Sequence, residues 1–278
     1  MFVAVIGFGS GPPFVKLALQ EFYVMDLMAV RFSLAFSLML IFALIMRADL
    51  KIKRIGFTPF LMGLLNPFLV TLSFHIGLLL TSPVNGVALI STLPIWQPFV
   101  ARLFLKEKIE IKVIIGTLIL LTSQTKSGQG NYVGDLIIFL GMICVSVNEV
   151  LGRRFMQTKV DQLGVNTYQY FIGAILSLLV LFIIWPNSSF EYQNYLNFSP
   201  PVLAAITLSC ITFGAYLFYN FALRRVPVGR ISLMYPLTGP IGATMSWLII
   251  DSPISTKVFI SLAIILIGTI IPQINKPS

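Results

Sequence analysis

The stretch "LISTLPIWQPFVARLFLKEK", residues 89–108, begins as an apolar run of the kind that crosses a membrane and ends in a basic cluster. Its centre holds Pro94 and Pro98, and a proline inside a helix removes a backbone hydrogen bond and bends the chain. Trp96 and Gln97 lie between the two prolines. Carbonyl groups released in this way are tolerated at membrane depth where a neighbour or a water-filled cavity satisfies them. The stretch therefore predicts a bent membrane helix beside a cavity.

The composition of the whole chain is that of a membrane protein. Of its 278 residues, 57% are hydrophobic and 10% are charged, and the mean hydropathy is +0.91. A bilayer core about 30 Å thick needs a helix of about 20 apolar residues. We therefore expect an all-α polytopic membrane protein with ten transmembrane helices. Breaks at charged, proline and glycine-rich positions place these helices at residues 2–20, 24–46, 56–80, 83–105, 109–125, 132–152, 165–186, 201–223, 228–250 and 254–273.

The basic residues divide the loops between these segments into two sets, and cytoplasmic loops carry the excess of Lys and Arg. Fifteen of the nineteen basic residues fall in alternate loops or at the C-terminal end. We expect a cell membrane protein, in a plasma or inner membrane, with both termini cytoplasmic and a retained first span. The net charge of +9 is thus read as membrane topology, and no nucleic acid partner is expected.

The residues that bind metals and nucleotides are sparse. Cys144 and Cys210 both lie within apolar segments, and His75 is the single histidine. Neither a disulfide framework nor a metal site is indicated, and we expect no cofactor. The sequence has no Gly-x-x-x-x-Gly-Lys-Ser/Thr phosphate loop, so the energy for any transport would come from solute or ion gradients.

The two halves of the chain resemble each other when one is shifted by 145 residues. The shift matches Ile109 with Ile254 and Lys112 with Lys257, and it places Pro94 beside the position matched to Pro240. Each half holds five expected spans, an odd number, so the second copy would cross the membrane in the opposite sense. Inverted repeats with broken helices are typical of secondary transporters. The alternative is that two Leu- and Ile-rich membrane segments align by chance.

This repeat predicts two five-helix units, residues 1–127 and 131–275. The second copy of the opening stretch is "MYPLTGPIGATMSWLIIDSP", residues 234–253, where Pro236 and Pro240 predict helix bends like those expected at Pro94 and Pro98. The two bent helices would face one common site from opposite directions.

Several motifs resemble the EamA type of the drug/metabolite transporter superfamily. They are "FGSGPPFVKLAL" in the first span, "AVRF" in the second, "GLLLTSPVNGVALISTLPI" followed by "LFLKEKIEIKVIIGTLIL", and "ALRRVPVGRISLMYPLTGP" in the second half. The chain departs from the family where Phe8 replaces Trp, and where Ser252 and Ser261 replace the usual Glu and Gly. The resemblance implies a ten-helix transporter with a central cavity that works by alternating access.

Polar side chains at membrane depth usually face a cavity or a partner. Tyr216 and Asn220 are four residues apart on one helical face, and Tyr168 and Gln169 are adjacent in the seventh span. With Trp96, Gln97 and Tyr235 they are candidates for the substrate path. Aromatic walls with a few neutral hydrogen-bonding groups suit a small amphipathic or zwitterionic solute.

Three ionisable residues are candidates for coupling or gating: Lys16, His75 and Glu149. Each also has a structural interpretation. Lys16 could extend its amine to the membrane interface, and His75 could cap or pair near the outer end of its span. Glu149 is spaced to form an ion pair with Arg153, four residues on, which we favour over a proton-coupling role.

Arg31 and Asn66 are two further polar residues at membrane depth. Arg31 lies well inside the second span and needs an acceptor. Asp26, five residues earlier, is reachable only loosely, and we favour a structural pairing for Arg31. Asn66 and His75 lie on opposite faces of the third span, so at most one of them would line a central path.

Together these observations predict a secondary transporter that exports small metabolites, such as amino acids, across a lipid bilayer. An integral-membrane enzyme or a non-transporting membrane subunit is the alternative. Intramembrane enzymes need clustered nucleophiles, bases or metal ligands, and such clusters are sparse in this sequence. The oligomeric state is left open.

Overall fold

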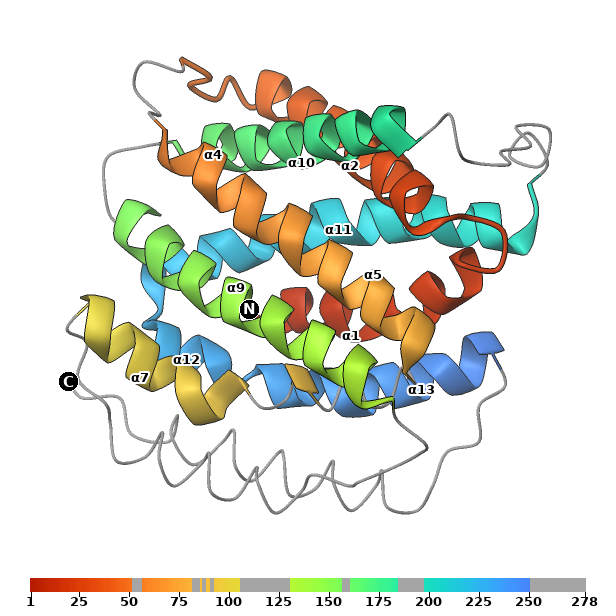
Figure 1. The fold of residues 1–278 in the computed structure, drawn as a ribbon. Helices are drawn as coiled ribbons and strands as arrows, with labels where there is room; N and C mark the ends of the chain where they lie inside the picture. Colours follow the sequence, from red (N-terminus) through yellow and green to blue (C-terminus); the bar gives the residue numbers. More distant parts are fainter. Residues whose placement is uncertain are drawn as a thin grey trace.

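The computed structural model describes residues 1–51, 57–81, 86, 89–90, 93–105, 131–156, 161–184 and 198–250. This part of the chain is helical and contains no strand (Figure 1). Its elements are α1 (Phe2–Ala18), α2 (Val24–Ile45), α4 (Thr58–Gly63), η1 (Leu64–Leu69), α5 (Val70–Leu80), α7 (Leu93–Leu105), α9 (Tyr132–Met156), α10 (Gln162–Ile184), α11 (Pro200–Arg225), α12 (Val228–Ser232), η4 (Tyr235–Leu237) and α13 (Thr238–Ile250).

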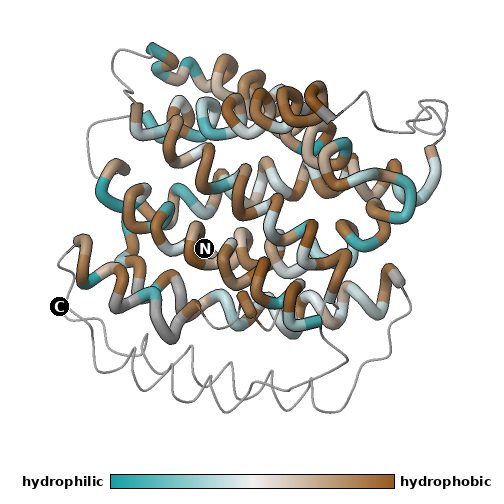
Figure 2. The backbone as a smooth tube through the Cα atoms, viewed as in Figure 1, coloured by the Kyte–Doolittle hydropathy of each residue, from teal (hydrophilic) through white to brown (hydrophobic). Residues whose placement is uncertain are grey.

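Five helical segments in the described part are long and apolar enough to cross a membrane. They are Val24–Ile45, Thr58–Leu80, Tyr132–Phe155, Gln162–Ile183 and Pro200–Arg225, and α1 is a shorter apolar helix. Apolar residues run along all of these helices, and hydrophilic residues are more frequent toward their ends (Figure 2). The protein is therefore a multi-pass membrane protein. The spans expected at 109–125 and 254–273 lie outside the described residues.

The helices form a bundle in which segments far apart in the sequence are neighbours (Figure 1). Helix α1 packs against α11 and α13, α5 packs against α9, and α2 packs against α10 and α11. Helix α7 packs against α9 and α12. Each half of the sequence therefore makes its main contacts with the other half.

Glycines allow the closest of these approaches. A Cβ at Gly77 on α5 would lie 2.3 Å from Cγ1 of Ile138 on α9, and one at Gly7 on α1 would lie 2.7 Å from Cβ of Ala215 on α11. Small residues at helix interfaces are common in membranes, because association there depends on close van der Waals packing. These two glycines set the spacing of the α5–α9 and α1–α11 pairs.

The third expected span, residues 56–80, is broken in its middle. Between α4 and α5 the segment η1 contains a kink, where Asn66 has the non-helical angles φ −142° and ψ 113°. The residue before a proline is disfavoured in the helical conformation, and Pro67 has no N–H to donate. Hydropathy alone predicts an unbroken helix here, whereas Pro67 is the sequence signal for the break.

The ninth span is also interrupted. Helix α12 ends at Ser232, a turn leads into the 3-10 helix η4 that contains Pro236, and α13 then begins, with Pro240 in its first turn. In the fourth span, Pro94 is the second residue of α7, and α7 continues through Pro98.

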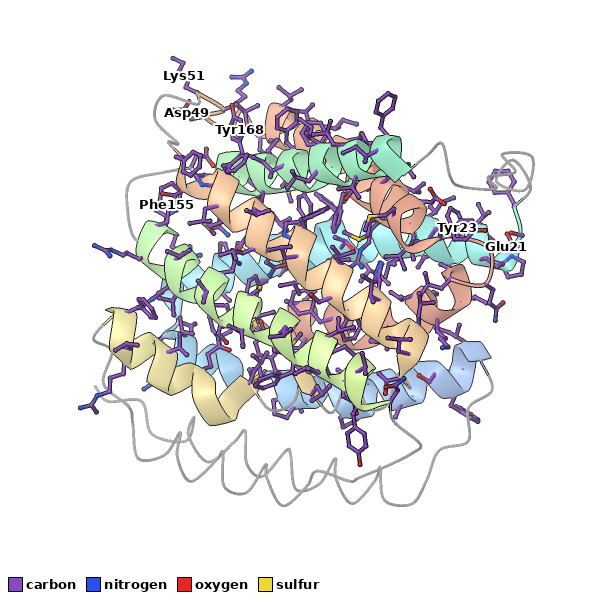
Figure 3. All side chains as sticks on the ribbon, viewed as in Figure 1. Glu21, Tyr23, Asp49, Lys51, Phe155 and Tyr168 are labelled. Carbon is purple, nitrogen blue, oxygen red and sulfur yellow. The ribbon has the colours of Figure 1, made fainter. Side chains whose placement is uncertain are left out.

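The two sets of loops lie at opposite ends of the bundle. Asp49, Lys51 and Phe155 lie at one end, and Glu21 and Tyr23 lie at the other (Figure 3). At the second end Ser199 donates a hydrogen bond of 2.8 Å to Glu21, which joins the start of α11 to the loop after α1. Among the described segments, the loop after α1 thus lies at the end of the bundle opposite the loop that follows α2 and the C-terminal end of α9 (Figure 3).

Candidate functional site

A cavity of about 110 Å³ lies at the centre of the bundle. Its walls come from both halves of the chain: α1, α2, η1, α5 and α7 from the first, α9, α11 and η4 from the second. Its polar lining residues are Arg31, Asn66, Thr71, Thr212, Tyr216, Tyr219 and Tyr235. Most of the remaining lining is aliphatic or aromatic, as in many small-molecule sites.

Four aromatic rings form one wall of this cavity. The ring of Phe8 on α1 meets Tyr216 edge-on at a centroid distance of 5.1 Å and Tyr219 at 5.7 Å, and it stacks on Tyr235 at 6.4 Å. Tyr216 and Tyr219 also meet edge-on, at 5.9 Å. We call these four residues the aromatic wall.

Arg31 brings a positive charge to the cavity. Its Nε donates to Oγ1 of Thr212 at 2.7 Å, and its Nη1 lies 3.1 Å from Nε2 of His75. Because a guanidinium can only donate, Nε2 of His75 is the acceptor, so the imidazole is neutral with its proton on Nδ1. Both partners come from other helices, α11 and α5.

Arg31 is thus paired with Thr212 and His75, and not with Asp26, which the sequence offered as a loosely reachable partner. Asp26 is buried in the first turn of α2 and forms no hydrogen bond to Arg31. Five residues of separation place the two side chains on different parts of the helix surface, and the neighbouring helices supply closer partners for Arg31.

Thr212 holds Arg31 in place because the threonine is itself fixed. Its hydroxyl donates to the carbonyl of Leu208 at 2.6 Å while accepting from Arg31, and its own carbonyl accepts from Tyr170 at 3.0 Å. The guanidinium is thus oriented by a network that spans α2, α5, α10 and α11.

Glu149 lies behind the aromatic wall and is fully buried. Its Oε1 accepts hydrogen bonds from the hydroxyls of both Tyr219 and Tyr235, while its Oε2 has no partner in the described part of the chain. The expected ion pair with Arg153 is not what holds this carboxylate. Nη1 of Arg153 instead donates to the carbonyl of Leu223 at 2.7 Å.

A second contact joins the cavity wall to the break in the third span. The hydroxyl of Tyr216 on α11 donates to Oδ1 of Asn66 in η1. Both residues line the cavity, so Asn66, and not His75, is the member of that pair that faces it.

Three other candidates for the substrate path, Asn220, Gln169 and Tyr168, do not line the cavity. Nδ2 of Asn220 donates to Oδ1 of Asn166 and, at 3.1 Å, to Oε1 of Gln169, which forms a buried amide cluster between α10 and α11. The hydroxyl of Tyr168 donates to the carbonyl of Leu50 at 2.8 Å, beside the loop that carries Asp49 (Figure 3).

The remaining candidates lie apart from the cavity or outside the description. Nζ of Lys16 donates to the carbonyl of Leu78 at 3.2 Å and so ties α1 to α5. Gln97 is buried, and Ser146 donates to its Oε1 at 3.5 Å. The side chains of Pro94, Trp96 and Pro98 lie outside the described residues.

The structure thus brings Tyr216 and Tyr235 together at the cavity and adds four residues that were not among the path candidates: Phe8, Arg31, Asn66 and Tyr219. Tyr219 follows Tyr216 by three residues, a helical spacing that could have indicated it. For Arg31 the sequence favoured a structural role only. Among the described residues, no group of three His, Cys, Asp or Glu side chains could hold a metal ion.

Comparisons with known proteins identify a family, related sequences and a solved structure that are similar to this chain. The EamA-like transporter family model matches residues 1–124 and 132–272. An uncharacterized transporter of Bacillus subtilis (strain 168), YyaM, is 27% identical over 97% of this chain and 92% of its own length. A second transporter of that organism, the uncharacterized YetK, is 24% identical over 96% of this chain and 84% of its own length. A solved protein structure aligns with a TM-score of 0.76 and 18% identity, over 98% of this chain and 96% of that one, so the two share a fold.

Proposed function

We propose that this chain, which belongs to the EamA-like transporter family, is a secondary transporter that exports small metabolites such as amino acids or related amphipathic solutes by alternating access. The observation that carries the proposal is the central cavity, whose walls come from both halves of the chain. A site shared by two halves opens to one side or the other when the halves move relative to each other.

The pattern of helix contacts supports an inverted repeat of two five-helix units, residues 1–127 and 131–275. In span order, α1 corresponds to α9, α2 to α10, α5 to α11, and α7 to α13. Exchanging these partners turns the α1–α11 contact into the α9–α5 contact, and it turns the α1–α13 contact into the α9–α7 contact. The α2–α10 contact maps onto itself, as expected for helices that meet on a two-fold axis.

The residue numbers agree with this exchange. A shift of 145 residues places α7 on α13, and Pro94 near the start of α7 falls beside the position of Pro240 in the first turn of α13. We propose that the interrupted segments, η1 in the first unit and η4 in the second, supply the bends about which the units move. Each of them contributes a lining residue, Asn66 and Tyr235.

Glu149 remains a candidate for coupling or gating, together with Lys16 and His75. Because two tyrosine hydroxyls hold Glu149 behind the aromatic wall, we expect Glu149→Gln to lower the yield of folded protein more than the response to a pH gradient. Normal yield with a lost response to the gradient would instead identify Glu149 as the group that carries the proton.

We also propose a plasma or inner membrane location with both termini cytoplasmic. Described basic residues that this topology assigns to the cytoplasm, such as Lys51, Arg102 and Arg153, lie where α2, α7 and α9 end. Single cysteines placed in these loops should react with an impermeant thiol reagent only from the cytoplasmic side.

Flux through purified protein in liposomes tests the function. We expect labelled phenylalanine, leucine or another small amphipathic metabolite to enter proteoliposomes faster when the same unlabelled solute is inside, because alternating access couples the two directions. Folded protein that gives no flux above empty liposomes across a broad metabolite panel would contradict transport. Turnover of a lipid or other solute without flux would favour an integral-membrane enzyme.

A further inference from the structure

The positive charge of Arg31 has no counter-ion in the described part of the cavity. Its partners there are the hydroxyl of Thr212 and the neutral imidazole of His75. A charged side chain at membrane depth is energetically costly and is normally paired, so an uncompensated guanidinium facing a cavity needs an explanation.

The other acidic residues do not supply the missing charge. Of the ten in the chain, Glu21, Asp49, Asp135 and Asp161 lie at helix ends or in loops, and Glu149 is bound by Tyr219 and Tyr235. Asp26 forms no hydrogen bond to Arg31. The four acidic residues outside the description are Glu107, Glu110, Glu191 and Asp251, which the sequence places in loops or at the ends of expected spans.

We propose that Arg31 is the binding site for a carboxylate group of the transported solute. This rests on the proposed transport function and adds to it the class of substrate, small organic acids and zwitterions, and the residue that recognises them. A guanidinium binds a carboxylate through parallel hydrogen bonds in a fixed geometry, and Thr212 and His75 hold this guanidinium while it lines the cavity.

The aromatic wall receives the rest of such a solute. Phe8, Tyr216, Tyr219 and Tyr235 line the same cavity as Arg31 and offer ring faces to an apolar or ammonium-bearing group. Tyr216 and Arg31 line the same cavity, so one small molecule can reach both features. Solutes without a carboxylate group would leave the charge of the guanidinium uncompensated, and the site selects against them.

Thermal unfolding of the detergent-purified full chain tests this site directly. The probes are 3-phenylpropionate and its neutral isostere 3-phenylpropionamide, titrated at constant ionic strength. We expect the acid to raise the unfolding temperature saturably and the amide to have no effect, because a ligand that binds only the folded state stabilises it. Arg31→Lys should weaken acid binding about 10-fold and Arg31→Gln about 100-fold, in line with the loss of charge-assisted hydrogen bonds.

Arg225→Gln is the matched control. It removes a cation that is exposed and lies 3.6 Å from the ring centre of Phe221, so acid binding should stay unchanged. Equal stabilisation by acid and amide, no stabilisation by the acid, or undiminished acid binding in Arg31→Lys would each overturn the carboxylate site. If Arg31→Gln does not fold, the wild-type acid and amide titrations and Arg31→Lys decide the question.

Flux separates this proposal from the function on which it rests. Transport of neutral or cationic solutes in preference to acids would overturn the role of Arg31 and leave the transporter intact. Arg31-dependent binding of the acid to a protein that moves no solute would support the site and contradict transport.

Discussion

Replacing Gly77 by alanine should weaken the packing of α5 against α9. The added Cβ would lie 2.3 Å from Cγ1 and 2.8 Å from Cδ1 of Ile138, and 2.9 Å from the carbonyl oxygen of Gly134. Ile138 is fully buried and cannot swing into open space, and the carbonyl belongs to the backbone of α9. The two helices must therefore separate, or the side chain must leave its preferred rotamer.

The size of the effect follows from two opposing terms. Inserting a methyl group into a well-packed interface typically costs about 1–3 kcal/mol, and a contact at 2.3 Å belongs at the upper end of that range. Alanine also favours the helix over glycine by about 1 kcal/mol. We therefore expect Gly77→Ala to lower the free energy of unfolding by about 2 kcal/mol.

Reversible unfolding in mixed detergent micelles, followed by circular dichroism, measures this difference. Gly214→Ala is the control, because a Cβ at Gly214 meets no atom within 4 Å and should leave stability equal or slightly higher. Combining Gly77→Ala with Ile138→Ala removes the clashing Cγ1, so the double variant should be less destabilised than the sum by about 1–2 kcal/mol. Equal stability of Gly77→Ala and Gly214→Ala, or strict additivity in the double variant, would refute the packing argument.

The polar contacts give two further predictions. Tyr235→Phe leaves Glu149 with Tyr219 as its one described donor and should lower the free energy of unfolding by about 1–3 kcal/mol, measured by the same unfolding assay. Stability equal to that of the wild type would show that this hydroxyl contributes nothing. Asn220→Leu, of similar shape, leaves Gln169 without that donor in the amide cluster and should destabilise by a similar amount. A more stable variant would indicate that packing outweighs the hydrogen bonds there.

Composition and motifs were enough to predict the membrane class and the family, because both depend on average hydropathy and on local patterns. The basic residues predicted which loops share an end of the bundle, and Lys51 and Glu21 lie at opposite ends (Figure 3). Ten helices and their inverted arrangement stay predictions, since the spans at 109–125 and 254–273 are not described.

Partners of buried polar residues were predicted poorly, for a physical reason. Spacing within one helix identifies only neighbours on that helix, so it suggested Asp26 for Arg31 and Arg153 for Glu149. In the bundle, the nearest groups come from other helices: Thr212 for Arg31 and the tyrosines for Glu149.

Same-face spacing failed for a related reason. Tyr216 and Asn220 are four residues apart on α11, yet Tyr216 faces the cavity and Asn220 faces α10. A helix in a crowded bundle contacts several neighbours, and one turn is enough to move a side chain from one interface to the next. The direction each side chain takes depends on which helix lies opposite, and that information comes only from the assembled fold.

The central claim, that the cavity is the path of the solute, is tested most directly by one pair of variants in a proteoliposome counterflow assay. Gly11 lines the cavity and a Cβ there has a single ordinary contact, 3.8 Å from Leu208, whereas Gly214 lies outside the lining. Gly11→Leu should therefore fill the cavity and abolish flux, while Gly214→Leu keeps the wild-type rate. Flux through folded Gly11→Leu that equals flux through Gly214→Leu would contradict this role of the cavity.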